Sequence, residues 1–165
     1  MKQPFEKLVE GHGATVLRVC RAVVGPADAE DVWQETFLAA LRAYPDLPAD
    51  ANTEAWLVTI AHRKSLDAVR AGRRRPSPVA QPPEDHSPHG IPGAERPGDG
   101  IWASVAQLPD KQRRVIAYRF LADLPFNDIA EIVGGSPAAA RRAASDGIRS
   151  LRAAFAAAHT EGESA

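Results

Sequence analysis

The chain has 165 residues, of which 44% are hydrophobic and 25% are charged, an ordinary composition for a globular protein. Its net charge of −1 argues against a protein that coats nucleic acid regardless of sequence, because such proteins are strongly basic.

Three helices are expected in the first half of the chain. Apolar residues recur at three- and four-residue steps over residues 5–23, which predicts a helix that ends at Gly25. A second helix is expected over residues 28–44, with acids in its first turn, where they favour the positive end of the helix dipole. Its expected inner side holds Val32, Trp33, Thr36, Phe37, Ala40, Leu41 and Tyr44. A third helix begins with Asn52 or Thr53 as N-cap, places Trp56 in the core and ends before Pro76.

Charges are divided unevenly over this half. Residues 28–50 hold six acids against one base, whereas residues 52–75 hold six bases against two acids. This asymmetry predicts two faces that meet different partners.

The stretch over residues 76–100 has a different composition. It holds seven prolines and four glycines, and almost nothing that could be buried. We interpret it as a linker between two domains. Beyond it, two helices are expected, a short one over residues 101–108 and a longer one over residues 111–122.

The last third of the chain has the pattern of a helix-turn-helix. Residues 124–133 form a short amphipathic segment, Gly134 and Gly135 break it, and Ser136 followed by Pro137 is a typical helix start. The expected buried stripe of the final helix is Ala140, Ala144, Ile148, Leu151 and Phe155. A separate outward stripe is polar and consists of Arg141, Ser145, Arg149 and Arg152. The tail over residues 156–165 is expected to be disordered beyond a frayed helix end.

No segment alternates β-branched and polar residues as a strand would. The expected fold class is therefore all-α, with two small helical domains joined by the linker. Cys20 is the single cysteine, which excludes an internal disulfide within this chain. No apolar run approaches the roughly 20 residues that cross a bilayer, and no secretory signal is evident. We expect a cytoplasmic protein without membrane insertion.

Catalysis is not expected. The sequence has no P-loop, zinc-protease helix or nucleophile elbow. His86 and His89 stand three residues apart in the linker, but we interpret them as solvated side chains rather than metal ligands. We expect no cofactor, no metal and no small-molecule substrate.

Two motifs resemble a known family, the extracytoplasmic-function (ECF) sigma factors. DAEDVWQETF at residues 28–37 resembles the family's polymerase-binding helix, and EAWLVTIA at residues 54–61 resembles the start of its promoter-melting helix. LPDKQRRV at residues 108–115, followed by DIAEIVG at residues 128–134, resembles its C-terminal DNA-binding domain. The two motifs occur in the family's order and are joined by a polar linker.

The resemblance implies a division of the chain and a set of partners. Residues 1–75 would be a region 2-like domain for core RNA polymerase and the minus-ten element, and residues 101–155 a region 4-like domain for the minus-thirty-five element. Residues 76–100 would be a flexible linker and residues 156–165 a disordered tail. The implied partners are core RNA polymerase, promoter DNA and an anti-sigma factor.

The resemblance also implies the contact residues. The polymerase-binding residues would be Asp31, Gln34, Glu35 and Phe37. Those at the minus-ten element would be Arg63, Lys64, Arg70, Arg73 and Arg74, bases that can neutralise phosphates. Those at the minus-thirty-five element would be Ser136, Arg141, Arg142, Ser145 and Arg149, near the start of a helix that enters the major groove.

The sequence departs from the family pattern at two places. His62-Arg63 replaces the usual Arg-Asn, and Ala143, Asp146 and Gly147 stand where Arg, Arg and Ala are common. We expect Asp146 to pair with Arg142 four residues earlier, and Gly147 to cost the helix about 1 kcal/mol relative to alanine.

Two alternatives stay open at this point. A stand-alone helix-turn-helix regulator would bind DNA without polymerase and would usually dimerise on a symmetric site. A sigma-like adaptor would bind polymerase or a regulator without productive promoter contact, and the departures at Ala143 and Asp146 favour it.

Overall fold

The computed structural model describes residues 2–74 and 100–163, and these residues form helices without a strand. The helices are α1 (Phe5–Val24), α2 (Pro26–Ala43), the short 3-10 helix η1 (Tyr44–Asp46), α3 (Thr53–Arg74), α4 (Gly100–Val105), α5 (Asp110–Phe120), α6 (Phe126–Val133) and α7 (Pro137–Glu163). The expected all-α fold class is confirmed. The expected linker lies outside the described residues except at Gly100, where α4 begins.

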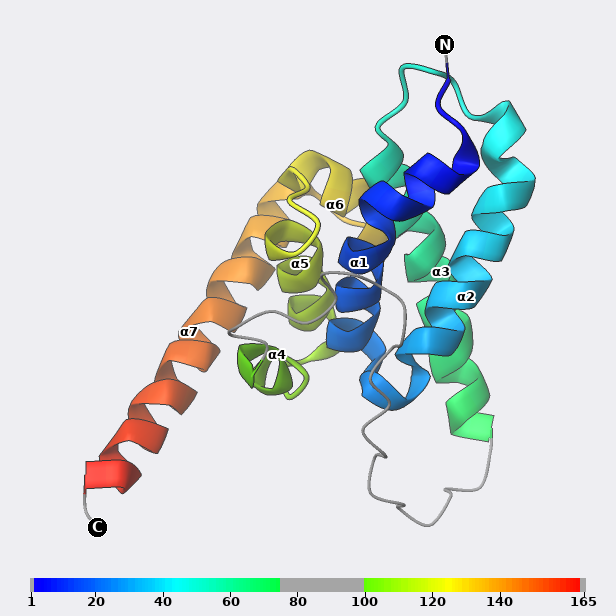
Figure 1. Ribbon diagram of the computed structural model, residues 1–165. Helices are drawn as coiled ribbons and strands as arrows, with labels where there is room; N and C mark the ends of the chain where they lie inside the picture. Colours follow the sequence, from blue (N-terminus) through cyan, green and yellow to red (C-terminus); the bar gives the residue numbers. More distant parts are fainter. Residues whose placement is uncertain (1, 75–99, 164–165) are drawn as a thin grey trace.

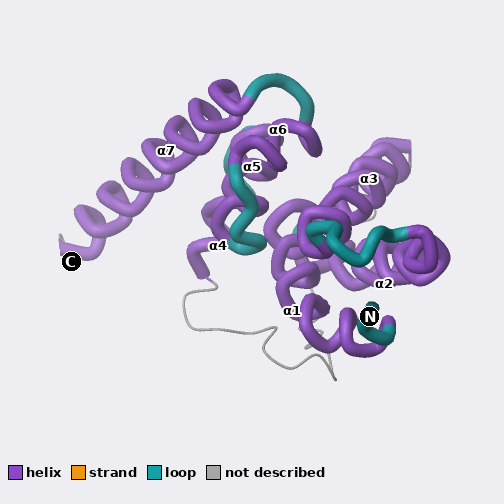
Figure 2. Tube along the Cα trace, turned by 90° about the horizontal axis from the view of Figure 1, so that it is seen from above, coloured by secondary structure: helices purple, strands orange, loops and turns teal. Residues whose placement is uncertain are grey.

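α1 lies at the centre of the molecule, between two groups of helices (Figures 1 and 2). α2 and α3 pack against one side of it, and α5 packs against the other. We call α1, α2, η1 and α3 the N-terminal group, and α4 to α7 the C-terminal group. α7 forms the outer edge, and its C-terminal half projects beyond the other helices (Figure 1).

The N-terminal group has an apolar core of its own. Its buried residues are Leu8, Val16, Leu17, Cys20, Ala29, Val32, Phe37, Ala40, Leu57 and Ala61. Trp56 packs against this core, with its ring 6.4 Å from that of Tyr44, so the expected core position of Trp56 is confirmed. Burial raises the pKa of the Cys20 thiol to about 12, which makes Cys20 an inert core residue.

A second core spans both groups. The N-terminal group contributes Val19, Ala22, Val23 and Val58 from α1 and α3. The C-terminal group contributes Val115, Ala117, Tyr118, Ala122, Leu124, Ile129, Ala140, Ala143 and Ala144. Apolar burial therefore continues across the boundary between the groups, and each group covers part of the other.

The helix starts follow the sequence signals closely. Asn52 caps α3, because its Oδ1 accepts a hydrogen bond from the Ala55 N–H at 3.1 Å. α2 begins at Pro26 rather than near Asp28, because proline suits the first position of a helix, where no N–H is required. α4 is shorter than expected and ends at Val105, after which a turn leads to Leu108.

The end of α7 differs from the expectation of a disordered tail. The helix continues to Glu163, through most of the residues for which the sequence predicts disorder. Alanine, the best helix former, occupies positions 153, 154 and 156–158, so local helix propensity favours continuation of the helix.

Within the described ranges, no helix combines the length and apolar character needed to span a membrane.

Candidate nucleic-acid and partner interfaces

The outer face of α2 combines acids with apolar groups. Asp31, Gln34 and Glu35 are exposed, as three- and four-residue steps along one helical face require. Leu38 and Leu41 continue this face, with 56% and 51% of their surface exposed. Sequence reasoning assigned Leu41 to the inner side and overlooked Leu38, because an apolar residue that meets a partner looks like one that meets the core.

Phe37 does not belong to this outer face. Its side chain is 6% exposed and packs beside Trp33, with the two rings 4.7 Å apart. The Trp33 indole N–H in turn donates to the carbonyl of Gly13 at 2.9 Å, which ties α2 to α1. Phe37 therefore supports α2 from inside, and its ring is not available as the partner contact that the sequence suggested.

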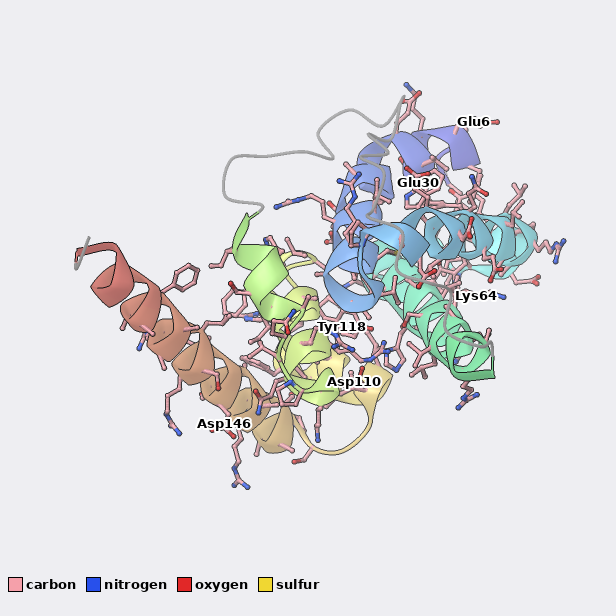
Figure 3. All side chains as sticks on the ribbon, turned by 90° about the horizontal axis from the view of Figure 1, so that it is seen from below. Glu6, Glu30, Lys64, Asp110, Tyr118 and Asp146 are labelled. Carbon is pink, nitrogen blue, oxygen red and sulfur yellow. The ribbon has the colours of Figure 1, made fainter. Side chains whose placement is uncertain are left out.

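α3 carries basic side chains along its second half. Arg63 and Arg70 are exposed, and Lys64, which Figure 3 labels on α3, is partly buried. Arg73 and Arg74 end the helix, but their side chains lie outside the described part of the chain. These bases therefore place positive charge along one helix. Among the ion pairs that the structure shows for the described residues, none involves Arg63, Lys64 or Arg70.

The helix-turn-helix is built by two glycines and a cap. Gly134 and Gly135 have φ angles of 89° and 90°, a conformation that side chains rarely adopt, and they turn the chain sharply between α6 and α7. Ser136 then caps α7, because its Oγ accepts a hydrogen bond from the Ala139 N–H at 3.1 Å. The predicted start of the final helix at Ser136-Pro137 is confirmed.

The first half of α7 presents a polar face. Arg141, Arg142, Ser145 and Arg149 are all exposed. The Arg141 guanidinium lies 5.6 Å from the centre of the Phe126 ring, and the Arg119 guanidinium lies 5.0 Å from it. Phe126, the first residue of α6, thereby orients Arg141 at the start of α7. No sequence pattern predicted this contact, since the apolar pattern alone assigns Phe126 to the core.

Packing explains two of the three departures in α7. Ala143 is 8% exposed and faces the shared core, where an arginine would have no access to solvent. A Cβ at Gly147 would come within 2.4 Å of Ile116 Cδ1, so glycine lets α7 approach α5 closely. Because positions 143 and 147 are both buried, Ala143 and Gly147 do not take a charged side chain away from the exposed face of α7.

Asp146 differs from the expectation. Its carboxylate pairs with Arg149, at 3.6 Å, and not with Arg142. The pair spans one turn toward the C-terminus and is well exposed, so it partly neutralises Arg149 while leaving Arg141 and Arg142 unaffected. In Figure 3 Asp146 lies on α7, on the side of the molecule away from the N-terminal group.

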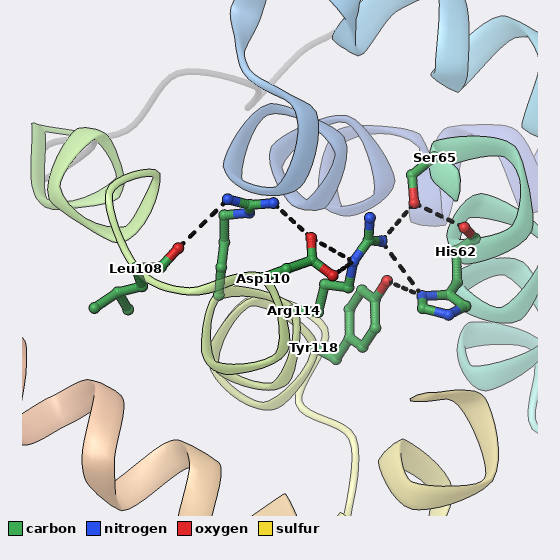
Figure 4. Close-up of polar contacts among 7 residues, drawn as sticks. His62, Ser65, Leu108, Asp110, Arg114 and Tyr118 are labelled. Carbon is green, nitrogen blue, oxygen red and sulfur yellow. Dashed lines mark hydrogen bonds and ion pairs between the residues drawn. The ribbon is translucent and has the colours of Figure 1, made fainter. Parts of the chain in front are cut away.

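A polar cluster joins the two groups, and no sequence pattern pointed to it. We call it the boundary cluster, and it consists of His62, Ser65, Asp110, Arg114 and Tyr118 (Figure 4). Arg114 in α5 is buried and donates to both oxygens of Asp110, at 3.1 and 3.0 Å, and across the boundary to Ser65 Oγ at 2.7 Å. Ser65 in turn donates to the carbonyl of His62 at 2.7 Å.

His62 completes the boundary cluster from α3. Its Nδ1 lies 2.7 Å from the Tyr118 hydroxyl and 3.5 Å from an Arg114 nitrogen. We assign Nδ1 as the acceptor, because a guanidinium can only donate. Burial, then the positive charge of Arg114, lowers the pKa of His62 to about 4, so the ring is neutral at physiological pH. Burial also raises the pKa of Tyr118, which keeps its hydroxyl protonated.

The described residues contain no group of three histidine, cysteine or acidic side chains placed to hold a metal ion. His86 and His89 lie outside the described residues.

A helix-turn-helix whose second helix begins with exposed arginines defines a helical DNA-binding protein. Comparison with family models makes this specific. The chain matches sigma-70 region 2 over residues 8–75 and sigma-70, region 4 over residues 105–153. It belongs to the ECF sigma-70 family.

Curated relatives and solved structures agree with this assignment. The chain is 32% identical to the ECF RNA polymerase sigma factor ShbA of Streptomyces griseus over 152 residues, which cover 83% of this chain and 80% of ShbA. It is 32% identical to SigC of Mycobacterium tuberculosis over 132 residues, which cover 79% of this chain and 71% of SigC. CnrH, solved in complex with the cytosolic domain of CnrY, matches with a TM-score of 0.66 at 24% identity, over 93% of this chain and 88% of CnrH. RpoE, solved with the anti-sigma factor NepR from Bartonella quintana, matches with a TM-score of 0.65 at 19% identity, over 89% of this chain and 92% of RpoE. At these identities the two structures show the shared fold.

Sigma factors bind core RNA polymerase and direct it to promoter DNA without catalysing a reaction, and this chain is an initiation factor of that kind. Family membership also decides against a stand-alone helix-turn-helix regulator.

Proposed function

We propose that this sigma factor works through three surfaces on two domains. Residues 1–75 form the region 2-like domain and residues 101–155 the region 4-like domain, with α2 binding core polymerase, α3 the minus-ten element and α7 the minus-thirty-five element. The observation that carries the proposal is the row of exposed acids and leucines along α2, which the fold leaves uncovered.

The polymerase contact is assigned to Asp31, Gln34 and Glu35, with Leu38 and Leu41 in place of Phe37. Large apolar side chains that stay more than half exposed are costly in water, and a partner that covers them gains their burial. The acids beside them attract basic side chains, which favours encounter and correct orientation.

The minus-ten contact is assigned to Arg63, Lys64, Arg70, Arg73 and Arg74. Positive side chains on one helix can hold the phosphates of an opened strand. This assignment rests on the exposure of Arg63 and Arg70 and on the order of bases along α3.

The minus-thirty-five contact is assigned to Ser136, Arg141, Arg142, Ser145 and Arg149. A helix that follows a tight turn can place its first residues against base edges in the major groove. The start of α7 is capped and exposed, and Arg141 is oriented by Phe126. The adaptor alternative loses its main support, because Ala143 and Gly147 are buried for packing and Asp146 pairs with Arg149.

We also propose that an anti-sigma factor binds this protein in the cytoplasm. CnrH and RpoE, which share its fold, were solved with the CnrY cytosolic domain and the anti-sigma factor NepR. The exposed leucines of α2 give such a partner an apolar surface that it could cover in competition with polymerase.

Run-off transcription with core polymerase on a genomic promoter library tests the proposal. Wild type should give discrete start sites, and Asp31→Arg should weaken polymerase binding about 5-fold to 150-fold, by the interface hot-spot scale of roughly 1–3 kcal/mol. Arg141→Glu should leave polymerase binding intact and abolish initiation at promoters that depend on the minus-thirty-five element.

Two matched variants serve as controls. Glu10→Arg reverses an exposed acid on α1, and Arg152→Glu reverses an exposed base about 16 Å further along α7 than Arg141. Both should behave as wild type or nearly so. A wild-type protein that binds polymerase and initiates nowhere, with no masking partner present, would return the adaptor hypothesis.

A further inference from the structure

Asp146 places a negative charge among the arginines of α7 that the proposed function assigns to promoter DNA. It follows Arg142 by four residues and precedes Arg149 by three, so the three side chains lie on one face of the helix. Figure 3 shows Asp146 on the side of α7 away from the N-terminal group. Its side chain is 43% exposed, and that of Arg149 is 81% exposed. A partner that covers this face therefore meets the carboxylate as well as the two guanidinium groups.

The contact with Arg149 leaves the carboxylate able to accept further hydrogen bonds. Asp146 Oδ1 and an Arg149 nitrogen are 3.6 Å apart. A charge-assisted hydrogen bond between such groups is about 2.7–2.9 Å long, so charge attraction holds this pair without a short, directed bond. An ionised carboxylate offers about four lone-pair sites. Both oxygens of Asp146 thus remain acceptors for a donor group on a partner.

A carboxylate suits one base edge of the major groove better than the others. Cytosine presents its N4 amine there, which is a donor, whereas guanine presents two acceptors and thymine an acceptor and a methyl group. Adenine has an amine at N6, but the N7 acceptor beside it repels a carboxylate. An acid on a helix that lies in the major groove therefore favours cytosine over the other three bases.

The side chains around Asp146 allow the close approach that its short side chain needs. Ala138 and Ser145 are exposed on the same face of α7, and neither is long enough to hold the helix away from the groove. Arg142 and Arg149 are long and exposed, so they can extend to phosphates while the helix lies close to the bases. Their positive charges offset the repulsion between Asp146 and the phosphates.

Base recognition by Asp146 differs from simple repulsion in its dependence on sequence. Phosphates are the same in every promoter, so an acid that only repelled them would weaken binding to all sequences equally. A carboxylate that accepts a hydrogen bond from a base spares the promoters that carry that base at one position. The two roles are therefore separated by the ratio of affinities between sequences, and not by the mean affinity.

We propose that Asp146 is a specificity-determining residue of this sigma factor, whose carboxylate accepts a hydrogen bond from the N4 amine of a cytosine in the minus-thirty-five element. This inference rests on the proposed function, because it requires α7 to lie in the major groove of that element. It adds a base contact to the arginines and serines already assigned there.

Selection of promoters by the holoenzyme tests the assignment. The full chain with core polymerase is allowed to bind a library randomised over the minus-thirty-five element, at a fixed salt concentration, and the bound DNA is sequenced. Wild type should enrich cytosine at one position, on one of the two strands. Asp146→Ala should reduce this preference about fivefold or more, the scale of a base contact, when the affinities for single-base variants of one promoter are measured.

Two further variants identify the cause of any change. Glu131→Ala removes an exposed acid from α6 and is the matched control, so it should keep the wild-type preference. Arg149→Gln removes the partner of Asp146 and should weaken binding to all sequences while the preference for cytosine remains. Positions 146 and 149 are not buried, and circular dichroism checks that both variants keep their helix content.

Three outcomes would overturn the inference: a wild type that selects no cytosine, an Asp146→Ala variant that keeps the preference or gains affinity for all sequences equally, or an Arg149→Gln variant that loses the preference. The last outcome would show that Asp146 acts only by orienting Arg149. If the wild-type holoenzyme selects no sequence at the minus-thirty-five element, the proposed role of α7 fails and the inference fails with it. Selection that does not depend on Asp146 would overturn only the inference.

Discussion

The two helical groups differ in how their interiors are completed. The N-terminal group encloses a core made only of residues from α1, α2 and α3. The C-terminal group shares its main core with α1 and α3, and its own smaller cluster consists of Val105, Leu108, Ile116 and Leu151. The N-terminal group thus has a main core of its own and adds only four residues to the shared core, whereas the main core of the C-terminal group depends on its neighbour.

This difference bears on how the molecule can change shape. A group with a complete core keeps its fold when its neighbour leaves, but one with a shared core exposes apolar surface. The boundary between them is also where Arg114 is buried. The C-terminal group is therefore the part whose position and stability depend on domain contact, and four substitutions or conditions can sharpen this comparison.

The largest effect is expected inside the N-terminal core. Leu57 is fully buried in it, so Leu57→Ala removes packed methyl groups and leaves a cavity. We expect a loss of about 2–5 kcal/mol in the free energy of unfolding, measured by urea denaturation. Leu41→Ala, at an exposed leucine on α2, should change it by no more than about 0.5 kcal/mol. Equal losses for both would show that the described core does not carry the stability of this group.

A smaller effect is expected where α7 meets α5. Gly147→Val adds a branched side chain where a Cβ alone comes within 2.4 Å of Ile116 Cδ1 and 3.4 Å of Leu108 Cδ1. Overpacking of this kind costs about 1–3 kcal/mol. Adding Ile116→Ala should recover part of the loss, so a double-mutant cycle in urea tests the contact. Ser150→Val, exposed on the same helix, is the control, and strictly additive losses would contradict the close approach.

The N-cap of α7 gives a still smaller and more local effect. Ser136→Ala removes the acceptor of the Ala139 N–H and should cost about 1 kcal/mol. Ser136→Asp supplies another acceptor and should retain most of the stability, although its charge would oppose DNA. Denaturation of both variants separates the capping role from DNA contact, because only the alanine variant should lose stability. If Ser136→Ala kept the wild-type stability, water would be satisfying the Ala139 N–H in place of the serine hydroxyl.

Local features of the fold were predictable because their causes are local. Ser136 and Asn52 cap their helices as the sequence indicates, and the paired glycines at 134 and 135 mark the turn. The continuation of α7 to Glu163 could have been anticipated from its alanines, but disorder was inferred from the small and polar end of the chain.

The partner-facing surfaces were predictable only in part. The exposed positions of Asp31, Glu35 and Arg141 follow from helical period, but Phe37 and Leu41 exchange their expected places. Hydrophobicity alone does not say whether a side chain is buried in its own core or by a partner. The family resemblance predicted which helices contact polymerase and promoter. The structure shows which side chains of those helices are exposed.

The boundary cluster could not be predicted. His62 and Tyr118 are 56 residues apart, and Ser65 and Arg114 are 49 residues apart. Both separations are longer than any single motif of the sequence. No helical or strand period links such positions, and a polar residue on a helix is ordinarily solvated. In the sequence His62 was a departure from a family pattern, whereas in the structure it binds the opposite domain.

The smallest predicted effect is a pH dependence of the domain contact. Docking holds the pKa of His62 near 4, because of burial and the Arg114 charge, with Arg63 acting in the same direction and Asp110 against it. When the two groups separate, the pKa of His62 returns toward its ordinary value of about 6.5. The docked arrangement binds fewer protons than the separated one, so the contribution of His62 to docking is complete above about pH 6.5 and is lost as the pH falls toward 4.

Spin labels on Asp50→Cys and Ser150→Cys, two exposed positions with one on each group, test this dependence, because Cys20 is buried and protected from the reagent. The distance between the labels is recorded by pulsed electron resonance from pH 7.5 down to 5.5, and a long distance marks molecules in which the groups have separated (the open fraction). The open fraction should rise a few-fold, less than full burial would give, because the ring is partly exposed to solvent. Glu54, close to His12 and Asp123, has a pKa that burial raises, so its titration acts in the opposite direction. A His62→Gln variant, which keeps a polar side chain without a titrating ring, should show no such trend, and a trend that persists in it would assign the pH response to another group.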